Sequence, residues 1–89
     1  MNVEVQDPVR YEEYKKLAPA SIAQYGGRYI ARGGRVEVME GDWTPQRLVI
    51  LEFPTVERAK EWWACSEYAV AKAMRNATAH TQLVITEGL

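Results

Sequence analysis

The feature that most limits the fold of this chain is one short run, Leu-Val-Ile-Leu-Glu-Phe, which is apolar on both faces of a strand. In an extended chain, successive side chains point to opposite faces. Leu48 and Ile50 therefore share one face, and Val49, Leu51 and Phe53 share the other. A chain of 89 residues suffices for a single modest core. Helices can cover only one face of such a sheet, so we expect a second copy of the chain to bury the other.

Helix caps, turns and periodicity divide the rest of the chain into elements. Asp7 is expected to cap a helix that begins at Pro8, and Thr55 to cap a second helix. The expected order is a strand at 2–5, a helix from 8 to the Gly26-Gly27 pair, strands at 28–40 and 47–53, a helix at 56–77, and a strand at 81–87. This β-α-β-β-α-β order is typical of a ferredoxin-like α+β fold, with one antiparallel sheet and two helices on one face. We therefore expect a single ferredoxin-like domain over residues 1–89.

Three positions predict irregularities within these elements. Pro19 is expected to kink the first helix or to split it near Ala18. The Gly33-Gly34 pair predicts a bulge or bend in the second strand. In the second long helix, Ser66 is a candidate for a second cap, with a kink near Cys65.

A turn about Trp43 sets the register that we expect for the hairpin. In this register, Val36 and Val38 join Leu48 and Ile50 on the face that the helices cover. The other face is mixed and suits a subunit interface; its members are Arg35, Glu37, Met39, Arg47, Val49, Leu51 and Phe53. A slip of one residue would exchange the two faces.

Charge and composition exclude several classes of protein. Eleven basic and twelve acidic residues give a formal net charge of −1, so we expect no nucleic-acid partner. No apolar run approaches the length of about 20 residues that spans a bilayer, and the N-terminus has no signal-peptide pattern. Cys65 is the single cysteine, which suits a reducing compartment. We therefore expect a cytoplasmic protein with no membrane partner.

A set of short motifs resembles the bacterial family catalogued as domain of unknown function 1330. The motifs are Asp7-Pro8, Tyr25-Gly26-Gly27, Arg32-Gly33-Gly34, Glu40 to Trp43, Pro45, Arg47, Glu52-Phe53-Pro54, and Trp63 with Ser66 and Tyr68. The resemblance implies the dimeric α/β-barrel superfamily, in which two such sheets pack face to face as a homodimer. It implies no established reaction, and therefore no catalytic residues. Similar family members begin with a longer first strand, whereas only Met1 to Gln6 precede the helix cap here.

The same superfamily includes cofactor-free monooxygenases and haem-degrading enzymes. In the haem-degrading group, residues resembling Trp63 and Ser66 are followed by a haem-ligating histidine, but Ala73 stands at that position here. The sequence offers no metal-ligand spacing and no glycine-rich nucleotide motif after a strand. We therefore expect no metal and no cofactor. His80, the only histidine, is expected at the surface, and Cys65 is expected to be a small buried hydrophobic residue.

If the fold contains a pocket, Arg32, Glu52, Trp63 and Tyr68 are the residues expected to line it. Arg32 precedes the expected bulge and would anchor an anion, while Glu52 would need a partner across the hairpin. Trp63 and Tyr68 would add an apolar wall and a hydrogen-bond donor. The plainer alternatives are an ion pair between Arg32 and Glu52, and simple packing for Trp63 or its neighbour Trp62.

Two functional hypotheses follow. The first is a homodimer that binds a small aromatic or anionic molecule between sheet and helices, with cofactor-independent oxidation or isomerisation as the activity suggested by superfamily analogy. The second is a non-catalytic ligand-binding or stress-related dimer. An open cavity with tryptophan, tyrosine and a buried charge favours the first, and a filled core favours the second.

Overall fold

The computed structural model describes all of residues 1–89 and contains three helices and four short strands. In chain order they are β1 (Asn2–Val5), α1 (Pro8–Gln24), β2 (Arg28–Arg32), β3 (Val49–Glu52), α2 (Val56–Ala64), α3 (Ser66–Thr78) and β4 (Ala79–Gln82). The fold is α+β, as the sequence predicts. None of the helices combines the length and the apolar character that a bilayer crossing needs.

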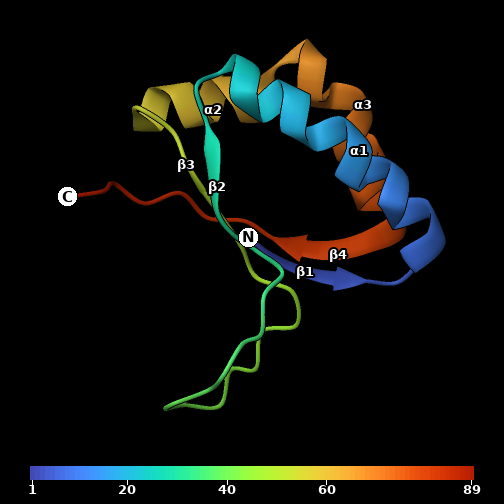
Figure 1. The fold of residues 1–89 in the computed structure, drawn as a ribbon, viewed down its shortest axis with the longest axis vertical. Helices are drawn as coiled ribbons and strands as arrows, with labels where there is room; N and C mark the ends of the chain where they lie inside the picture. Colours follow the sequence, from blue (N-terminus) through green and yellow to red (C-terminus); the bar gives the residue numbers. More distant parts are fainter.

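The strands form two small antiparallel sheets, one of β1 with β4 and the other of β2 with β3. The sheets meet where β1 runs beside the start of β3. There the Val3 amide donates to the Arg47 carbonyl at 2.8 Å, and an isolated antiparallel bridge joins Asn2 to Leu48. The three helices lie together along one side of the strands (Figure 1), with α1 packed along α3.

Aromatic side chains dominate the core between the helices and the strands. The rings of Trp62 in α2 and Tyr68 in α3 have centroids 4.1 Å apart, and Tyr14 of α1 meets Tyr68 edge-on. Phe53, which follows β3, packs on Trp62 with centroids 5.4 Å apart. The buried cluster consists of Val3, Tyr11, Tyr14, Ala18, Ile22, Trp62, Tyr68, Ala71 and Ala79. Because three of these residues are tyrosines, their hydroxyl groups need partners inside the fold.

The helix starts are confirmed. The Asp7 carboxylate accepts the Arg10 amide at 3.1 Å, and the Thr55 hydroxyl accepts the Arg58 amide at 3.0 Å. The second long helix breaks at Cys65, as predicted, because that residue has an extended backbone between α2 and α3.

One predicted cap is wrong, and of the two outcomes expected at Pro19 the split does not occur. Ser66 is not a cap: it is the first residue of α3, and its hydroxyl contacts Glu67 at 3.4 Å. Pro19 does not split α1, which continues through it to Gln24. Residues four positions apart in α1, such as Ala18 and Ile22, bury one continuous stripe, and this packing keeps the helix whole across the proline.

The predicted strands are too long. The second strand ends at Arg32, and residues 33–47 form an arm that extends away from the body (Figure 1). The expected bulge at Gly33-Gly34 lies instead between Tyr29 and Ala31, where the β2–β3 register shifts. The last strand covers Ala79–Gln82, and residues 83–89 follow it without strand structure.

The predicted faces of β3 are reversed. Val49 is buried, and Leu51 and Phe53 pack against the core under the helices. Ile50 is 44% exposed on the outer face, and Ile30 of β2 is 52% exposed. The error comes from the assumed pairing through a long hairpin, because the strand actually pairs over a few residues, with Leu51 opposite Tyr29. Val49, Leu51 and Phe53 therefore lie on the face that the helices cover, and not on the predicted mixed face.

Candidate ligand-binding site

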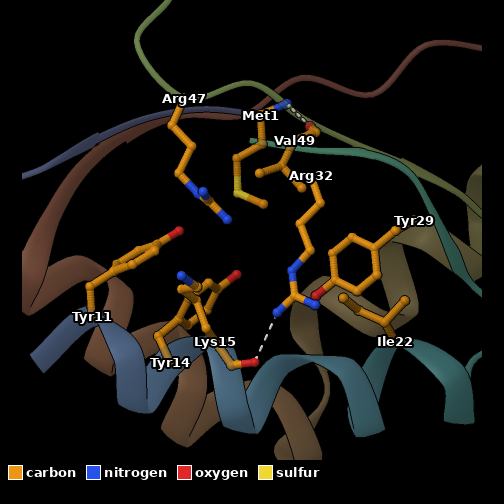
Figure 2. A pocket seen from close by; sticks show the side chains of 9 residues that line it. All are labelled: Met1, Tyr11, Tyr14, Lys15, Ile22, Tyr29, Arg32, Arg47 and Val49. Atoms are coloured by element: carbon orange, nitrogen blue, oxygen red, sulfur yellow. Dashed lines mark hydrogen bonds between the residues drawn. The ribbon is translucent and has the colours of Figure 1, made fainter. Parts of the chain in front are cut away.

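A small cavity lies between α1 and the inner face of the strands, where the two sheets meet (Figure 2). Its volume is ≈ 10 Å³, which is room for about one water molecule. The lining residues are Met1, Tyr11, Tyr14, Lys15, Ile22, Tyr29, Arg32, Arg47 and Val49. This lining contains three cationic side chains and three tyrosines but no carboxylate, so the cavity is positively charged and rich in hydrogen-bond donors.

Arg32 reaches the cavity because of the bulge in β2. Regular strand alternation would put Arg32 on the outer face together with Arg28. The register shift after Tyr29 instead places Arg32 opposite the buried Val49. Its guanidinium then lies over the Tyr29 ring, 4.6 Å from the centroid. The bulge therefore turns a surface arginine into a residue of the cavity.

Neither Arg32 nor Arg47 has a carboxylate partner, because the ion pairs of the structure use other basic residues. Arg32 Nη2 donates to the Lys15 main-chain carbonyl at 3.0 Å, and the buried Nε of Arg47 has no hydrogen-bond partner. The Arg47 guanidinium lies against Gly33, whose φ is +69°, and a Cβ at Gly33 would collide with it. Gly33 thus provides both the backbone turn and the space that Arg47 occupies.

A hydrogen-bonded chain links the cavity to a buried arginine. Arg75 is only 4% exposed, and its Nη1 donates to the Tyr68 hydroxyl at 2.9 Å. The Tyr68 and Tyr14 hydroxyls lie 2.8 Å apart, and Tyr14 lines the cavity. The Tyr68 oxygen accepts a hydrogen bond from Arg75, so the Tyr68 hydroxyl can donate its proton to the Tyr14 oxygen. The Tyr14 hydroxyl can then donate its own proton to a group in the cavity. Burial raises the pKa of the Tyr68 phenol above its usual value, so this hydroxyl stays protonated.

A comparison with known protein families identifies the family of this chain. The family profile described as Domain of unknown function (DUF1330) matches residues 1–89, which is the whole chain. The chain belongs to the DUF1330 family. The resemblance carried by the sequence motifs is thereby confirmed. No functionally curated protein matches the sequence, so the functional residues of this DUF1330 domain have to be derived from its own structure.

The DUF1330 domain divides the four predicted site residues between two places. Arg32 lines the cavity, and Tyr68 lies directly behind its wall through Tyr14. Glu52 points outward and pairs with Arg28 at 2.8 Å, so the predicted ion pair between Arg32 and Glu52 is wrong. Trp63 lies outside the cavity lining and, like Glu52, lines a separate open groove between β3, α2 and residues 83–89.

The two tryptophans divide between core and surface. Trp62 is buried in the core, whereas Trp63 is 45% exposed. The Lys72 ammonium lies over the Trp63 ring, 3.9 Å from its centroid. The other reactive side chains also lie outside the cavity lining. His80 is exposed on β4, and Cys65 packs half-buried against the core. No group of three or more potential metal ligands gathers anywhere in the domain.

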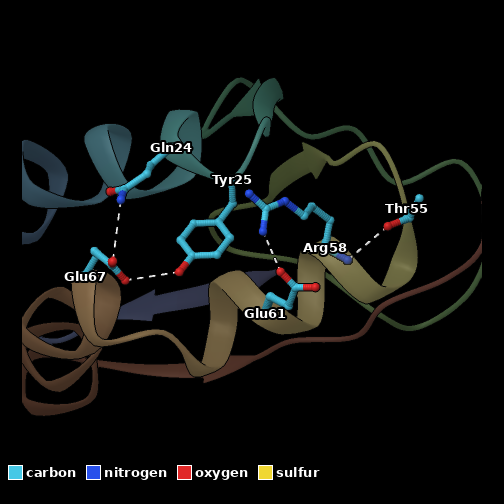
Figure 3. A network of polar contacts seen from close by, with 6 residues as sticks. All are labelled: Gln24, Tyr25, Thr55, Arg58, Glu61 and Glu67. Carbon is cyan, nitrogen blue, oxygen red and sulfur yellow. Dashed lines mark hydrogen bonds and ion pairs between the residues drawn. The ribbon is translucent and has the colours of Figure 1, made fainter.

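A second polar cluster fastens the end of α1 to the other helices (Figure 3). The Tyr25 hydroxyl donates to Glu67 at 3.1 Å, and the Arg58 guanidinium lies 4.5 Å from the Tyr25 ring centroid. Arg58 also pairs with Glu61. Arg58 is paired with Glu61, and Glu67 accepts hydrogen bonds from neutral side chains, so the cluster joins the helices at the surface.

Sequence reasoning missed most of the cavity. Tyr11 and Tyr14 lie on the buried stripe of α1 and pack in the core, but their hydroxyl groups also face the cavity (Figure 2). Arg47 was assigned to a subunit interface. A usable signal was present: a buried helical stripe made of tyrosines instead of leucines brings polar atoms inside, and these atoms need polar neighbours.

Proposed function

We propose that this DUF1330 domain is a small-molecule-binding protein whose ligand is a small organic anion, held between α1 and the strands. The observation that carries the proposal is the pair of arginines, Arg32 and Arg47, at a cavity without any carboxylate. Guanidinium groups bind carboxylates through short charge-assisted hydrogen bonds. The phenols of Tyr11 and Tyr14 supply further donors to the same space.

The size of the cavity limits how such a ligand enters. A space of ≈ 10 Å³ does not hold a whole metabolite. Arg32 is exposed and Arg47 is half-buried, so a ligand can reach both guanidinium groups from outside the cavity. We infer that the charged head of the ligand lies between the two guanidinium groups and that its remainder extends over the mouth. The partly exposed Tyr29 ring, which lies beside the Arg32 guanidinium, favours an aromatic or otherwise planar remainder.

The cavity favours binding over the enzymatic alternative of cofactor-independent oxidation or isomerisation. Proton abstraction at neutral pH needs a base with a pKa near 7. The lining contains no histidine and no carboxylate. Burial raises the pKa of the Tyr11 phenol, even though Arg47 beside it acts in the opposite direction. This tyrosine is therefore a hydrogen-bond donor rather than a base.

Calorimetry with benzoate and its neutral isostere benzamide tests the anion site. We expect the wild type to bind benzoate and not benzamide, and Arg47→Gln to weaken benzoate binding about tenfold or more, since a hydrogen bond to a charged group is worth roughly 1.5–3 kcal/mol. Arg35→Gln is the matched control, because Arg35 is exposed on the arm and pairs with Glu37. Equal binding of benzamide, or benzoate binding unchanged by both Arg32→Gln and Arg47→Gln, would refute the site.

We also propose a ferredoxin-like arrangement assembled as a homodimer through the outer face of the strands. The hydrogen bonds between β1 and the start of β3 support the spatial order β2-β3-β1-β4, with the helices on one side. Ile30 and Ile50 stay exposed on the other side. An open groove of ≈ 920 Å³ lies between β3, α2 and the tail, residues 83–89; it reaches both isoleucines and is lined mainly by apolar residues. This groove is too apolar for the anion, and a second copy is the occupant that best fits it.

The charges of the outer face suit a symmetric pair. Arg28 and Glu52 lie together on it, so a twofold axis would place opposite charges opposite each other. Light scattering coupled to size exclusion tests the assembly. We expect a dimer for the wild type and a monomer for Ile50→Asp. Val70→Asp, at an exposed position of α3, should remain dimeric. A wild-type mass of 10.1 kDa at micromolar concentration would rule the dimer out.

A further inference from the structure

An unusual residue in α1 is connected to the ligand site. The helix runs without interruption from Pro8 to Gln24, with Pro19 in its interior. Proline has no amide proton, so the carbonyl four residues earlier, that of Lys15, receives no helical hydrogen bond. Proline is also the least favourable residue for a helix interior. A proline here therefore leaves one acceptor open on the helix surface that faces the cavity.

Arg32 occupies that open acceptor. Its Nη2 donates to the Lys15 carbonyl at 3.0 Å, and both residues line the cavity (Figure 2). The Tyr29 ring supports the same guanidinium from one face. One of the five N–H donors of the guanidinium is used in this bond, and the others remain for a ligand. A long and exposed side chain is thus fixed in one orientation at the mouth of the cavity.

We propose that Pro19 is a positioning residue of the anion site, because its missing amide proton reserves the Lys15 carbonyl for Arg32. This inference rests on the proposed function, since it explains how the anion anchor is oriented. An alanine at position 19 would offer an amide proton to the Lys15 carbonyl. The carbonyl would then be shared with the helix, the bond from Arg32 would weaken, and the arginine would have to be ordered again at each binding event.

A double-mutant cycle on thermal stability tests the link without any ligand. In the wild-type background, Arg32→Met leaves the Lys15 carbonyl unpaired, and we expect the Tm to fall by roughly 4–8 °C, the shift produced by losing about one hydrogen bond in a domain of this size. In the Pro19→Ala background, the amide at position 19 satisfies the carbonyl, so the same substitution should lower the Tm by half as much or less. Equal losses in the two backgrounds would overturn the proposed link.

Benzoate titration of Pro19→Ala tests the consequence for binding. We expect a higher Tm than the wild type, because alanine favours the helix, together with benzoate affinity reduced about 3- to 10-fold. Val9→Ala, at an exposed position in the first turn of α1, is the control, because it also favours the helix but supplies no new amide proton; its affinity should match the wild type. Unchanged affinity in Pro19→Ala would overturn the positioning role. A wild type that fails to bind benzoate while the cycle shows coupling would refute the anion site and support the Pro19–Arg32 link.

Discussion

Removal of one buried hydroxyl group, by Tyr68→Phe, should destabilise this protein far more than the loss of one oxygen atom suggests. Tyr68 is fully buried, and its hydroxyl accepts from Arg75 at 2.9 Å and lies 2.8 Å from the Tyr14 hydroxyl. Without it, the buried Arg75 keeps a single side-chain partner, the Met1 sulfur at 3.3 Å. A buried cation that loses its best acceptor bears the full cost of its desolvation.

The size of the effect follows from the two lost interactions. The bond to charged Arg75 is worth about 1.5–3 kcal/mol and the neutral bond to Tyr14 about 0.5–1.5 kcal/mol. The Tyr14 hydroxyl can turn toward water in the cavity, so we expect a total loss of about 3 kcal/mol in the free energy of unfolding. For a domain of this length the total stability is roughly 4–13 kcal/mol, and the Tm should fall by about 12–24 °C.

Denaturant unfolding followed by tryptophan fluorescence measures this loss directly. Tyr25→Phe is the matched control, because its hydroxyl bonds to Glu67 at the surface, and we expect a loss below about 1 kcal/mol there. Adding Arg75→Met to Tyr68→Phe should recover much of the stability, since it removes the unpaired charge as well. A Tyr68→Phe loss no larger than the control, or a double variant whose loss is the sum of the two single losses, would refute the reasoning.

The remaining predictions concern pH and two glycines. Burial raises the pKa of Tyr68 above 10, so its contribution to stability is complete below pH 10 and is lost as the pH rises further. The free energy of unfolding should therefore fall more steeply above pH 10 in the wild type than in Tyr68→Phe. Equal slopes in the two proteins would contradict this. Gly33→Ala should displace the Arg47 guanidinium and weaken benzoate binding severalfold in calorimetry, whereas unchanged affinity would exclude Arg47 as an anchor. Gly27→Ala places a Cβ 2.5 Å from the Phe53 ring, and we expect a loss of about 1–3 kcal/mol in denaturant unfolding; a neutral result would mean that this ring moves freely.

Local chemistry made parts of the fold predictable. The caps at Asp7 and Thr55 and the break at Cys65 depend on a few neighbouring residues, and all three are confirmed. The strand lengths were not predictable in the same way. Residues 35–40 alternate like a strand, but a strand exists only where another backbone pairs with it in a ladder, and these residues belong to neither sheet.

The candidate site was predictable only in part, for a related reason. Arg32 was identified by its place beside a suspected bulge, and the bulge exists, but it lies before Arg32 rather than after it. Tyr68 was identified as a donor, and it acts through Tyr14, a contact between residues 54 positions apart in the chain. Such pairings depend on how α1 packs on α3, and no local pattern contains that information.

The sequence by itself determined the α+β class, the starts of the helices at their caps and, through its short motifs, the family. The class and the helix starts follow from periodicity and capping, which act over a few residues at a time, whereas the family follows from the resemblance of the motifs. Only the tertiary structure decided which face of β3 is covered, because a shift of one residue in register exchanges the faces. It also decided that Arg32 and Arg47 meet at one cavity without a carboxylate, since the bulge in β2 and the space at Gly33 act together only when the strands are paired.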